Sequence, residues 1–175
     1  DDPQPYNSWG NGSAMRVSPV GFAFDREEDV LAEARKSAEV SHNHPEGIKG
    51  AQSTALAIFM ARMGKSRDEI RGVISARFGY DLDRTVEGIR PDYSFNESCQ
   101  ETVPEAIVAF LDSDSYEDAI RNTISLGGDA DTLGAITGGI AEAFHGVPDE
   151  IGEKAEEFLP ADMEEAVQEF RAEYL

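Results

Sequence analysis

The stretch GGDADTLGAITGGIA at residues 127–141 decides the fold class of this chain. Its second half consists almost entirely of glycine, alanine and aliphatic residues, and it predicts a helix of small residues over positions 130–145. Each glycine inside a helix costs about 1 kcal/mol relative to alanine, so close packing by neighbouring helices has to compensate. We therefore expect this helix at the centre of a helical bundle.

Helical patterns extend over most of the remaining chain, and no alternating run predicts a sheet, so the expected class is all-α. Capping boxes are predicted at Asp25 with Glu28 and at Ser66 with Glu69, and Ser115 is expected to cap a later helix. Besides residues 130–145, the expected helices cover about 13–17, 26–40, 45–63, 67–78, 103–111, 116–126, 149–158 and 162–174. Residues 79–102 show no sustained period, and a loop of this length is usually functional or disordered.

Length and composition predict one domain over residues 1–175, with a real hydrophobic core, because 40% of the residues are hydrophobic. The formal net charge of −20 opposes binding to nucleic acid or to an anionic membrane. No apolar run approaches the length that spans a membrane. The acidity is most simply explained by a solvated surface.

The single cysteine, Cys99, excludes an internal disulfide, so we expect a reducing compartment, the cytoplasm, and an inert, buried thiol. The chain begins at Asp1 rather than at a methionine, and no signal peptide is visible. We therefore expect either a processed chain or a piece of a longer one.

Two carboxylates and a hydroxyl, from Asp129, Asp131 and Thr132, fall within four residues where the small-residue helix should begin. Hard cations such as Mg²⁺ or Mn²⁺ prefer oxygen ligands of this kind. A simpler interpretation is that Asp129 caps the helix and Asp131 offsets its dipole. Acidic first turns are common, so spacing alone favours the simpler interpretation.

A glycine-containing loop, WGNGSAMR at residues 9–16, is expected to lead into a short helix. Free backbone N–H groups at such a position bind phosphate well. Asn11 and Ser13 add polar groups, and Trp9 or Met15 is placed to touch an adenine or a ribose. A pair of nearby glycines is most often only a turn, so this signal is weak alone.

Two histidines, His42 and His44, precede the helix that begins at Pro45. A closed zinc site needs about four protein ligands, and the rest of the chain offers only His145 and Cys99 as further histidine or cysteine ligands, so zinc is not expected. One interpretation is a histidine that caps the helix entry. The other is a neutral donor to a phosphate or ribose, and spacing does not choose between them.

Together, three segments resemble the ADP-ribosylglycohydrolase family. They are GNGSAMR at residues 10–16, HNHPEGIKGA at residues 42–51 and GGDADT at residues 127–132, and the likeness runs across nearly the whole chain. The resemblance implies an orthogonal all-α bundle of the ADP-ribosylglycohydrolase type, truncated at its amino terminus. It implies a hydrolase that removes ADP-ribose from ADP-ribosylated protein or a related conjugate.

The family pattern also implies roles for particular residues. By this resemblance, Asp129, Asp131 and Thr132 bind two divalent ions, Mg²⁺ or Mn²⁺. Asn11, Gly12 and Ser13 cradle the diphosphate of ADP-ribose, Met15 lies near the ligand, and His42, not His44, contacts it. Each of these assignments is carried over from the resemblance.

This chain departs from the family at one motif, an earlier segment with a glutamate and a threonine-aspartate-aspartate sequence, which supplies the other metal ligands. The pair Asp1 and Asp2 does not replace it, because no threonine precedes it. The catalytic residue is therefore unassigned.

Three hypotheses follow: a hydrolase, a non-catalytic ADP-ribose or nucleotide binder, and a scaffold, as in the family's crystallin. Apolar surface left uncovered by the absent segment predicts a homodimer or an exchange of segments.

Overall fold

The computed structural model describes residues 4–175, and within this range every regular element is a helix. The helices are α1 (Gly12–Met15), α2 (Ser18–Ala23), α3 (Glu27–Glu39), α4 (Pro45–Arg62), α5 (Arg67–Phe78), α6 (Val86–Ile89), α7 (Cys99–Leu111), α8 (Tyr116–Leu126), α9 (Ala130–His145), α10 (Asp149–Glu156) and α11 (Ala161–Tyr174). The predicted all-α class is confirmed. Asp1 and Asp2, which were considered as replacement ligands, lie outside the described residues.

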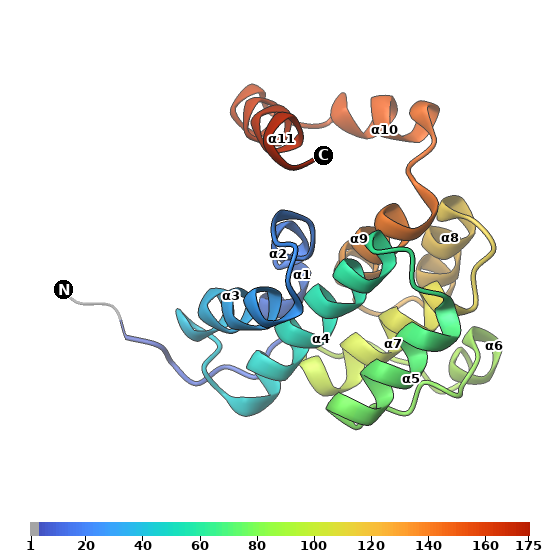
Figure 1. Ribbon diagram of the computed structural model, residues 1–175. Coiled ribbons are helices and arrows are strands. Elements are labelled where there is room, and N and C mark those ends of the chain that lie inside the picture. Colours follow the sequence, from blue (N-terminus) through green and yellow to red (C-terminus); the bar gives the residue numbers. More distant parts are fainter. Residues whose placement is uncertain (1–3) are drawn as a thin grey trace.

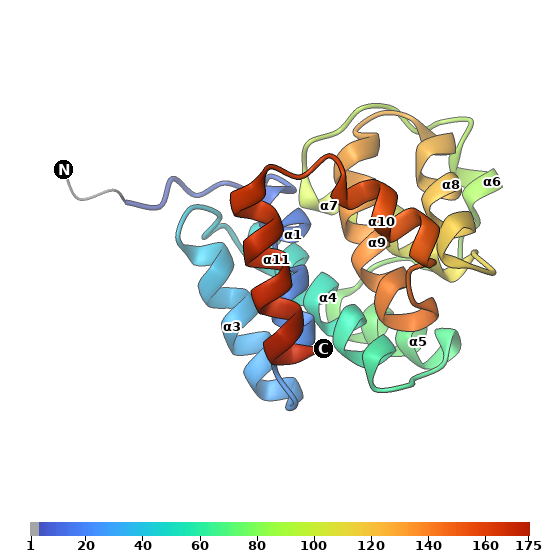
Figure 2. The same ribbon diagram turned by 90° about the horizontal axis from the view of Figure 1, so that it is seen from above.

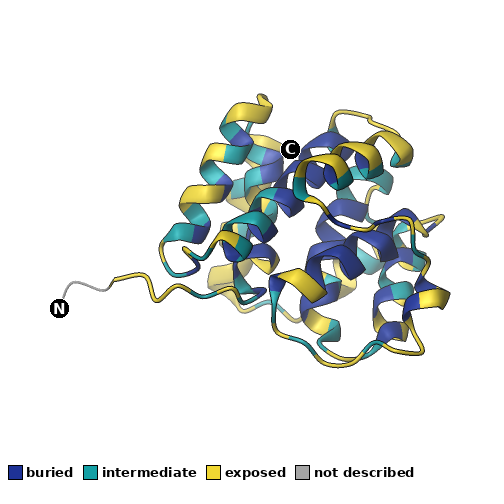
Figure 3. Cartoon of the chain, turned by 90° about the horizontal axis from the view of Figure 1, so that it is seen from below, coloured by how far each residue is buried: buried dark blue, intermediate teal, exposed yellow. Residues whose placement is uncertain are grey.

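Helices α4, α7 and α9 form the centre of the bundle (Figure 1). Buried residues gather in these helices, whereas the outer helices expose one face (Figure 3). A side chain on Gly139 of α9 would place its Cβ 2.6 Å from the Ser18 Oγ of α2, so these two helices approach closely at this glycine. The small-residue helix is thus central and closely packed, as predicted.

Two of the predicted helix caps agree with the structure, and one does not. Ser66 and Glu69 form a complete capping box on α5, and Ser115 accepts a hydrogen bond from the Asp118 N–H at the start of α8. The capping box expected from Asp25 and Glu28 on α3 was wrong, because no side chain caps that helix.

The side chains expected at the start of α3 are engaged elsewhere. Asp25 accepts a hydrogen bond from Arg62 at 3.0 Å, and Glu28 accepts one from Arg26 at 2.7 Å. The two carboxylates therefore bind the guanidinium groups of arginines and do not cap the helix.

The segment 79–102 contains more helix than its sequence suggests. Thr85 caps the short helix α6, and α7 begins at Cys99, four residues before the predicted start, with Pro104 inside it. The early turns persist because Cys99 and Thr102 are buried and the Cys99 N–H donates to the Trp9 carbonyl. Tertiary contacts here outweigh the local effect of proline.

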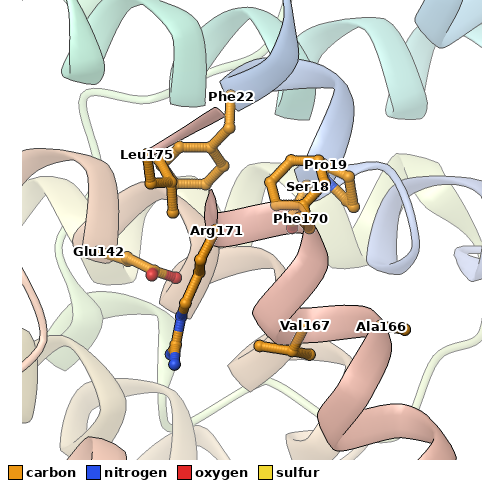
Figure 4. Close-up of a pocket in the computed structure, with 9 residues that line it drawn as sticks. All are labelled: Ser18, Pro19, Phe22, Glu142, Ala166, Val167, Phe170, Arg171 and Leu175. Carbon is orange, nitrogen blue, oxygen red and sulfur yellow. The ribbon is translucent and has the colours of Figure 1, made fainter. Parts of the chain in front are cut away.

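Helices α10 and α11 form an arm that crosses one end of the bundle (Figures 1 and 2). Neither helix contains a buried residue. The arm leaves the bundle after Gly146, whose φ of 74° favours glycine. A cavity of about 380 Å³ lies where α11 faces α2 and α9, with Phe170 and Leu175 pointing towards Pro19 and Phe22 (Figure 4).

No helix in the described range combines the length and the apolar character that crossing a bilayer requires.

Candidate functional site

The glycine loop at residues 9–12 is held against a segment far along the chain. The Asn11 N–H donates to the Glu97 carbonyl at 2.8 Å, and Gly10 forms an isolated antiparallel bridge with Ser98. Sequence reasoning assigned no site residue to the segment around Glu97. Its only signal was the absence of periodicity over residues 79–102, which is typical of functional loops.

A cavity of about 410 Å³ opens between this loop, the preceding residues 6–8, His42 and Glu97. Its size lies within the range of about 300–1,000 Å³ that is usual for small-molecule sites. Trp9, which is 53% exposed, stands at its edge and also lines a neighbouring cavity of about 570 Å³. The loop therefore borders two adjoining openings, and one of them is lined by the predicted residues Asn11, Gly12 and His42.

The two histidines have different surroundings: the capping interpretation is confirmed for His44, and the donor interpretation stays a prediction for His42. His44 caps α4, because its Nδ1 accepts a hydrogen bond from the Glu46 N–H at 3.1 Å. His42 is buried beside the loop, and a Cβ on Gly12 would lie 3.2 Å from its Nε2. Burial and then the charge of Arg16 lower the pKa of His42, which keeps the ring neutral at pH 7.

A chain of hydrogen bonds orients the His42 ring. Arg16 donates to the Ser41 Oγ at 3.0 Å, and that oxygen lies 2.7 Å from the His42 Nδ1. Since Arg16 only donates to this oxygen, the Ser41 hydroxyl proton is available for donation to Nδ1. This arrangement favours a proton on Nε2, the nitrogen next to Gly12 and the cavity.

Ser13, which was predicted to cradle a diphosphate, has a fully buried side chain. Its Oγ donates to the Gly47 carbonyl at 2.7 Å and lies 3.5 Å from the Cys99 Sγ. The hydroxyl thus joins α1 to α4 and is not directed to the cavity. Burial raises the pKa of Cys99 to about 11, in agreement with the expected inert thiol.

The carboxylates at the start of α9 face the same loop. Asp129 occupies the N-cap position, yet its side chain does not cap the helix. Its Oδ2 accepts a hydrogen bond from the Asn11 Nδ2 at 2.6 Å. The Thr132 hydroxyl donates to the Met15 sulfur at 3.6 Å, so the loop and the start of α9 meet at two points.

The simple capping interpretation of Asp129 therefore fails. The pKa of Asp131 is lowered, first by interaction with the Asp129 side chain and then by the Thr132 N–H, which donates to the Asp131 Oδ1 at 3.0 Å, so the two carboxylates lie near each other. Two neighbouring carboxylates beside a hydroxyl fit a hard cation that keeps part of its water shell. Within residues 4–175, no three His, Cys, Asp or Glu side chains gather as a metal site.

Further polar groups lie near Asp129 at the start of α9 and were not predicted. Burial, followed by the charges of Glu105 and Asp129, raises the pKa of Tyr93 to about 12, which keeps its hydroxyl protonated. Glu105 is itself buried and paired with Arg84 at 2.9 Å. Both residues lie in or after the segment without periodicity, so spacing offered no signal for them.

Comparisons with known proteins agree with this geometry. The chain matches the ADP-ribosylglycohydrolase family over residues 1–174. It belongs to that family. The resemblance carried by the three motifs is thereby confirmed.

This family member is similar to the human ADP-ribosylhydrolase ARH3, with 30% identity over 185 residues that cover 80% of this chain and 51% of the relative. It is 32% identical to the ADP-ribosyl-[dinitrogen reductase] glycohydrolase of Rhodospirillum rubrum, covering 80% of this chain and 47% of that protein. The chain thus spans about half the length of these relatives.

A solved structure, described as an ADP-ribosylglycohydrolase-related protein complex, has the same fold. It superposes with a TM-score of 0.75 at 26% identity and covers 98% of this chain and 63% of that chain. The predicted helical bundle of the ADP-ribosylglycohydrolase type is confirmed.

Proposed function

We propose that this chain binds ADP-ribose at the glycine loop and, with Mg²⁺ or Mn²⁺, removes it from ADP-ribosylated protein or a related conjugate. The observation that carries the proposal is the meeting of three distant segments: Asn11 contacts Asp129, and His42 packs against Gly12. Family membership adds the reaction class, since the matched relatives are named as ADP-ribosylhydrolases and glycohydrolases.

In this proposal the diphosphate lies at Gly12 and Ser13, whose backbone N–H groups belong to the first turn of α1 and have no partner within the helix. The Nε2 of His42 donates to a phosphate or ribose oxygen and stays neutral at pH 7. Met15 and Trp9 offer apolar contact to the ribose or adenine, since both side chains are about half exposed at the loop.

Asp129, Asp131 and Thr132 are the residues that would hold the divalent ions. When bound, such ions position the ribose and lower the pKa of a water molecule. Asn11 keeps Asp129 turned towards the loop, and the contact between Met15 and Thr132 keeps the two segments together. In this proposal an anion-binding loop lies directly beside a cation site.

Incubation with an ADP-ribosylated peptide tests this function, with free ADP-ribose measured in Mg²⁺ and in a chelator. We expect metal-dependent release that Asp129→Ala and Asp131→Ala abolish. Asp162→Ala, on the exposed face of α11, is the matched control and should keep full activity. Release that persists in the chelator would contradict the role of the metal.

The non-catalytic hypothesis predicts a different result from the same samples. ADP-ribose would bind and raise the melting temperature, as any ligand of the folded state does, but no free ADP-ribose would be released. The scaffold hypothesis predicts neither binding nor release. Calorimetry with ADP-ribose separates these two outcomes.

We also propose a homodimer in which the α10–α11 arm is exchanged between two copies. The arm buries no residue of its own, and the cavity beneath it is lined by Pro19, Phe22 and Phe170, so a second copy offers the same contacts. A strictly monomeric mass in light scattering would contradict this.

We place the protein in the cytoplasm because its one thiol is free, and fractionation of host cells would test that location.

A further inference from the structure

The Asn11 side chain joins three parts of the molecule. Its Nδ2 lies 2.6 Å from the Asp129 Oδ2, 3.1 Å from the Thr102 Oγ1 and 3.5 Å from the Asn96 carbonyl. An amide nitrogen carries two hydrogens, and the two shortest contacts use both. The residue is 7% exposed, so its amide nitrogen is committed to the protein and is not free for a diphosphate.

The backbone of Asn11 is held independently of its side chain. Its N–H donates to the Glu97 carbonyl at 2.8 Å, and its own carbonyl accepts from the N–H groups of Ala14 and Met15 at 2.9 and 3.1 Å. A substitution of the side chain should therefore leave the loop in place. This separation allows the contact with Asp129 to be tested alone.

The contact with Asp129 also explains why this aspartate does not cap α9. A charge-assisted hydrogen bond is roughly twice as strong as a neutral one. The donor takes one oxygen, Oδ2, and leaves the other carboxylate oxygen for a second partner. Asp131, two residues further along the first turn of α9, carries a second carboxylate near this one.

We infer that Asn11 is a positioning residue, which holds the Asp129 carboxylate in the orientation that a divalent cation requires and does not itself contact ADP-ribose through its amide nitrogen. The inference rests on the proposed function for the identity of the cation site. Residues that orient ligands in this way typically change metal affinity by roughly 10- to 100-fold when removed.

The test measures two affinities separately in the same chain. Electron paramagnetic resonance of free Mn²⁺ gives the metal affinity, and calorimetry without metal gives the affinity for ADP-ribose. We expect Asn11→Ala to weaken Mn²⁺ binding by roughly 10- to 100-fold. The metal-free affinity for ADP-ribose should stay unchanged, because the loop backbone is fixed.

Thr102→Val is the matched control, since it removes the other buried hydrogen bond of Asn11 without touching Asp129. It should leave Mn²⁺ binding unchanged. If Asn11→Ala does not fold, Asn11→Ser replaces it, because a serine side chain is too short to reach Asp129. In the Asp129→Ala background, Asn11→Ala should have no further effect on Mn²⁺ affinity.

Several results would overturn the inference. The first is an unchanged Mn²⁺ affinity in Asn11→Ala. The second is an equal loss of Mn²⁺ affinity in Thr102→Val. The third is a loss of metal-free ADP-ribose binding in Asn11→Ala. A wild-type chain that binds no Mn²⁺ also overturns it. A chain that binds Mn²⁺ through Asn11 and Asp129 but releases no ADP-ribose supports the inference and overturns the proposed hydrolysis.

Discussion

Helices α9 and α11 are close in the sequence and similar in length, yet they differ in how deeply they are buried in the bundle. α9 contains eight buried residues, whereas α11 contains none. Their intrinsic helix propensities are in the opposite order. α9 carries Gly134, Gly138 and Gly139, which disfavour a helix, while α11 is rich in alanine and glutamate, which favour one.

The difference shows that packing, not helix propensity, holds the candidate site in place. Most helical stability in proteins comes from tertiary contacts. The start of α9 carries Asp129, Asp131 and Thr132, so the site depends on the packed part of the molecule. The following changes test the contrast between the packed bundle and the arm.

The largest expected effect compares two phenylalanines, Phe110 in α7 and Phe170 in α11. Phe110 is fully buried and packs edge-on against Phe144 at 5.3 Å, so Phe110→Ala should cost about 3–5 kcal/mol. Phe170 is only partly buried, so Phe170→Ala should cost about 1 kcal/mol. Urea unfolding measures both, and equal costs would contradict the contrast between bundle and arm.

A smaller effect is expected from adding one methyl group at a glycine. A Cβ on Gly21 of α2 would lie 2.6 Å from the Ile58 Cβ and 2.9 Å from the Ala55 carbonyl oxygen. Because backbone cannot yield easily, Gly21→Ala should destabilise the protein by about 2 kcal/mol.

The control for this change is Gly152 of α10, where a Cβ would meet only the Val147 Cγ1 at 3.7 Å. Gly152→Ala should stabilise the chain by up to about 1 kcal/mol, since alanine is the better helix former. Thermal unfolding of both variants gives the comparison. A stabilised Gly21→Ala would show that α2 is not packed as described.

The smallest effect concerns pH. The pKa of His42 is lowered in the folded state, so between about 6.5 and that lowered value the unfolded chain binds more protons than the native chain. Stability should therefore be unaffected by His42 above this window and fall as the pH drops through it. Residue-specific NMR titration should find more than half of the His42 rings neutral at pH 6.5, because the pKa lies below the ordinary value.

Arg16→Ala sharpens this prediction, because removing the positive charge beside the ring should raise the pKa of His42. Burial remains, so the rise should be partial. A titration of His42 at the ordinary histidine value in the wild-type chain would show that the ring is not enclosed by the loop.

Much of the fold could be predicted from local pattern. The small-residue helix, the capping box at Ser66 and the cap at Ser115 all follow from side-chain chemistry over a few residues, and the structure has each of them. The prediction failed at Asp25, because the competing Arg62 is 37 residues away in the sequence and spacing does not reveal it.

The candidate site could likewise be predicted only in part. The sequence pointed to Asp129, Asp131 and Thr132, to the glycine loop and to His42, and the ligand roles of these residues stay predictions. For the Glu97 segment its only signal was the absence of a sustained period, and this segment forms one wall of the cavity by backbone hydrogen bonds. Backbone pairing of this kind depends on position and carries no side-chain signature.

The sequence by itself determined the helical class, the central place of the small-residue helix and the presence of a carboxylate pair at its start, because these depend on residue size and local spacing. Only the tertiary structure decided that Asn11 holds Asp129 across 118 residues, and that His44 caps a helix while His42 faces the loop. A hydrogen bond between distant segments exists only after packing has brought them together, so no local pattern specifies it.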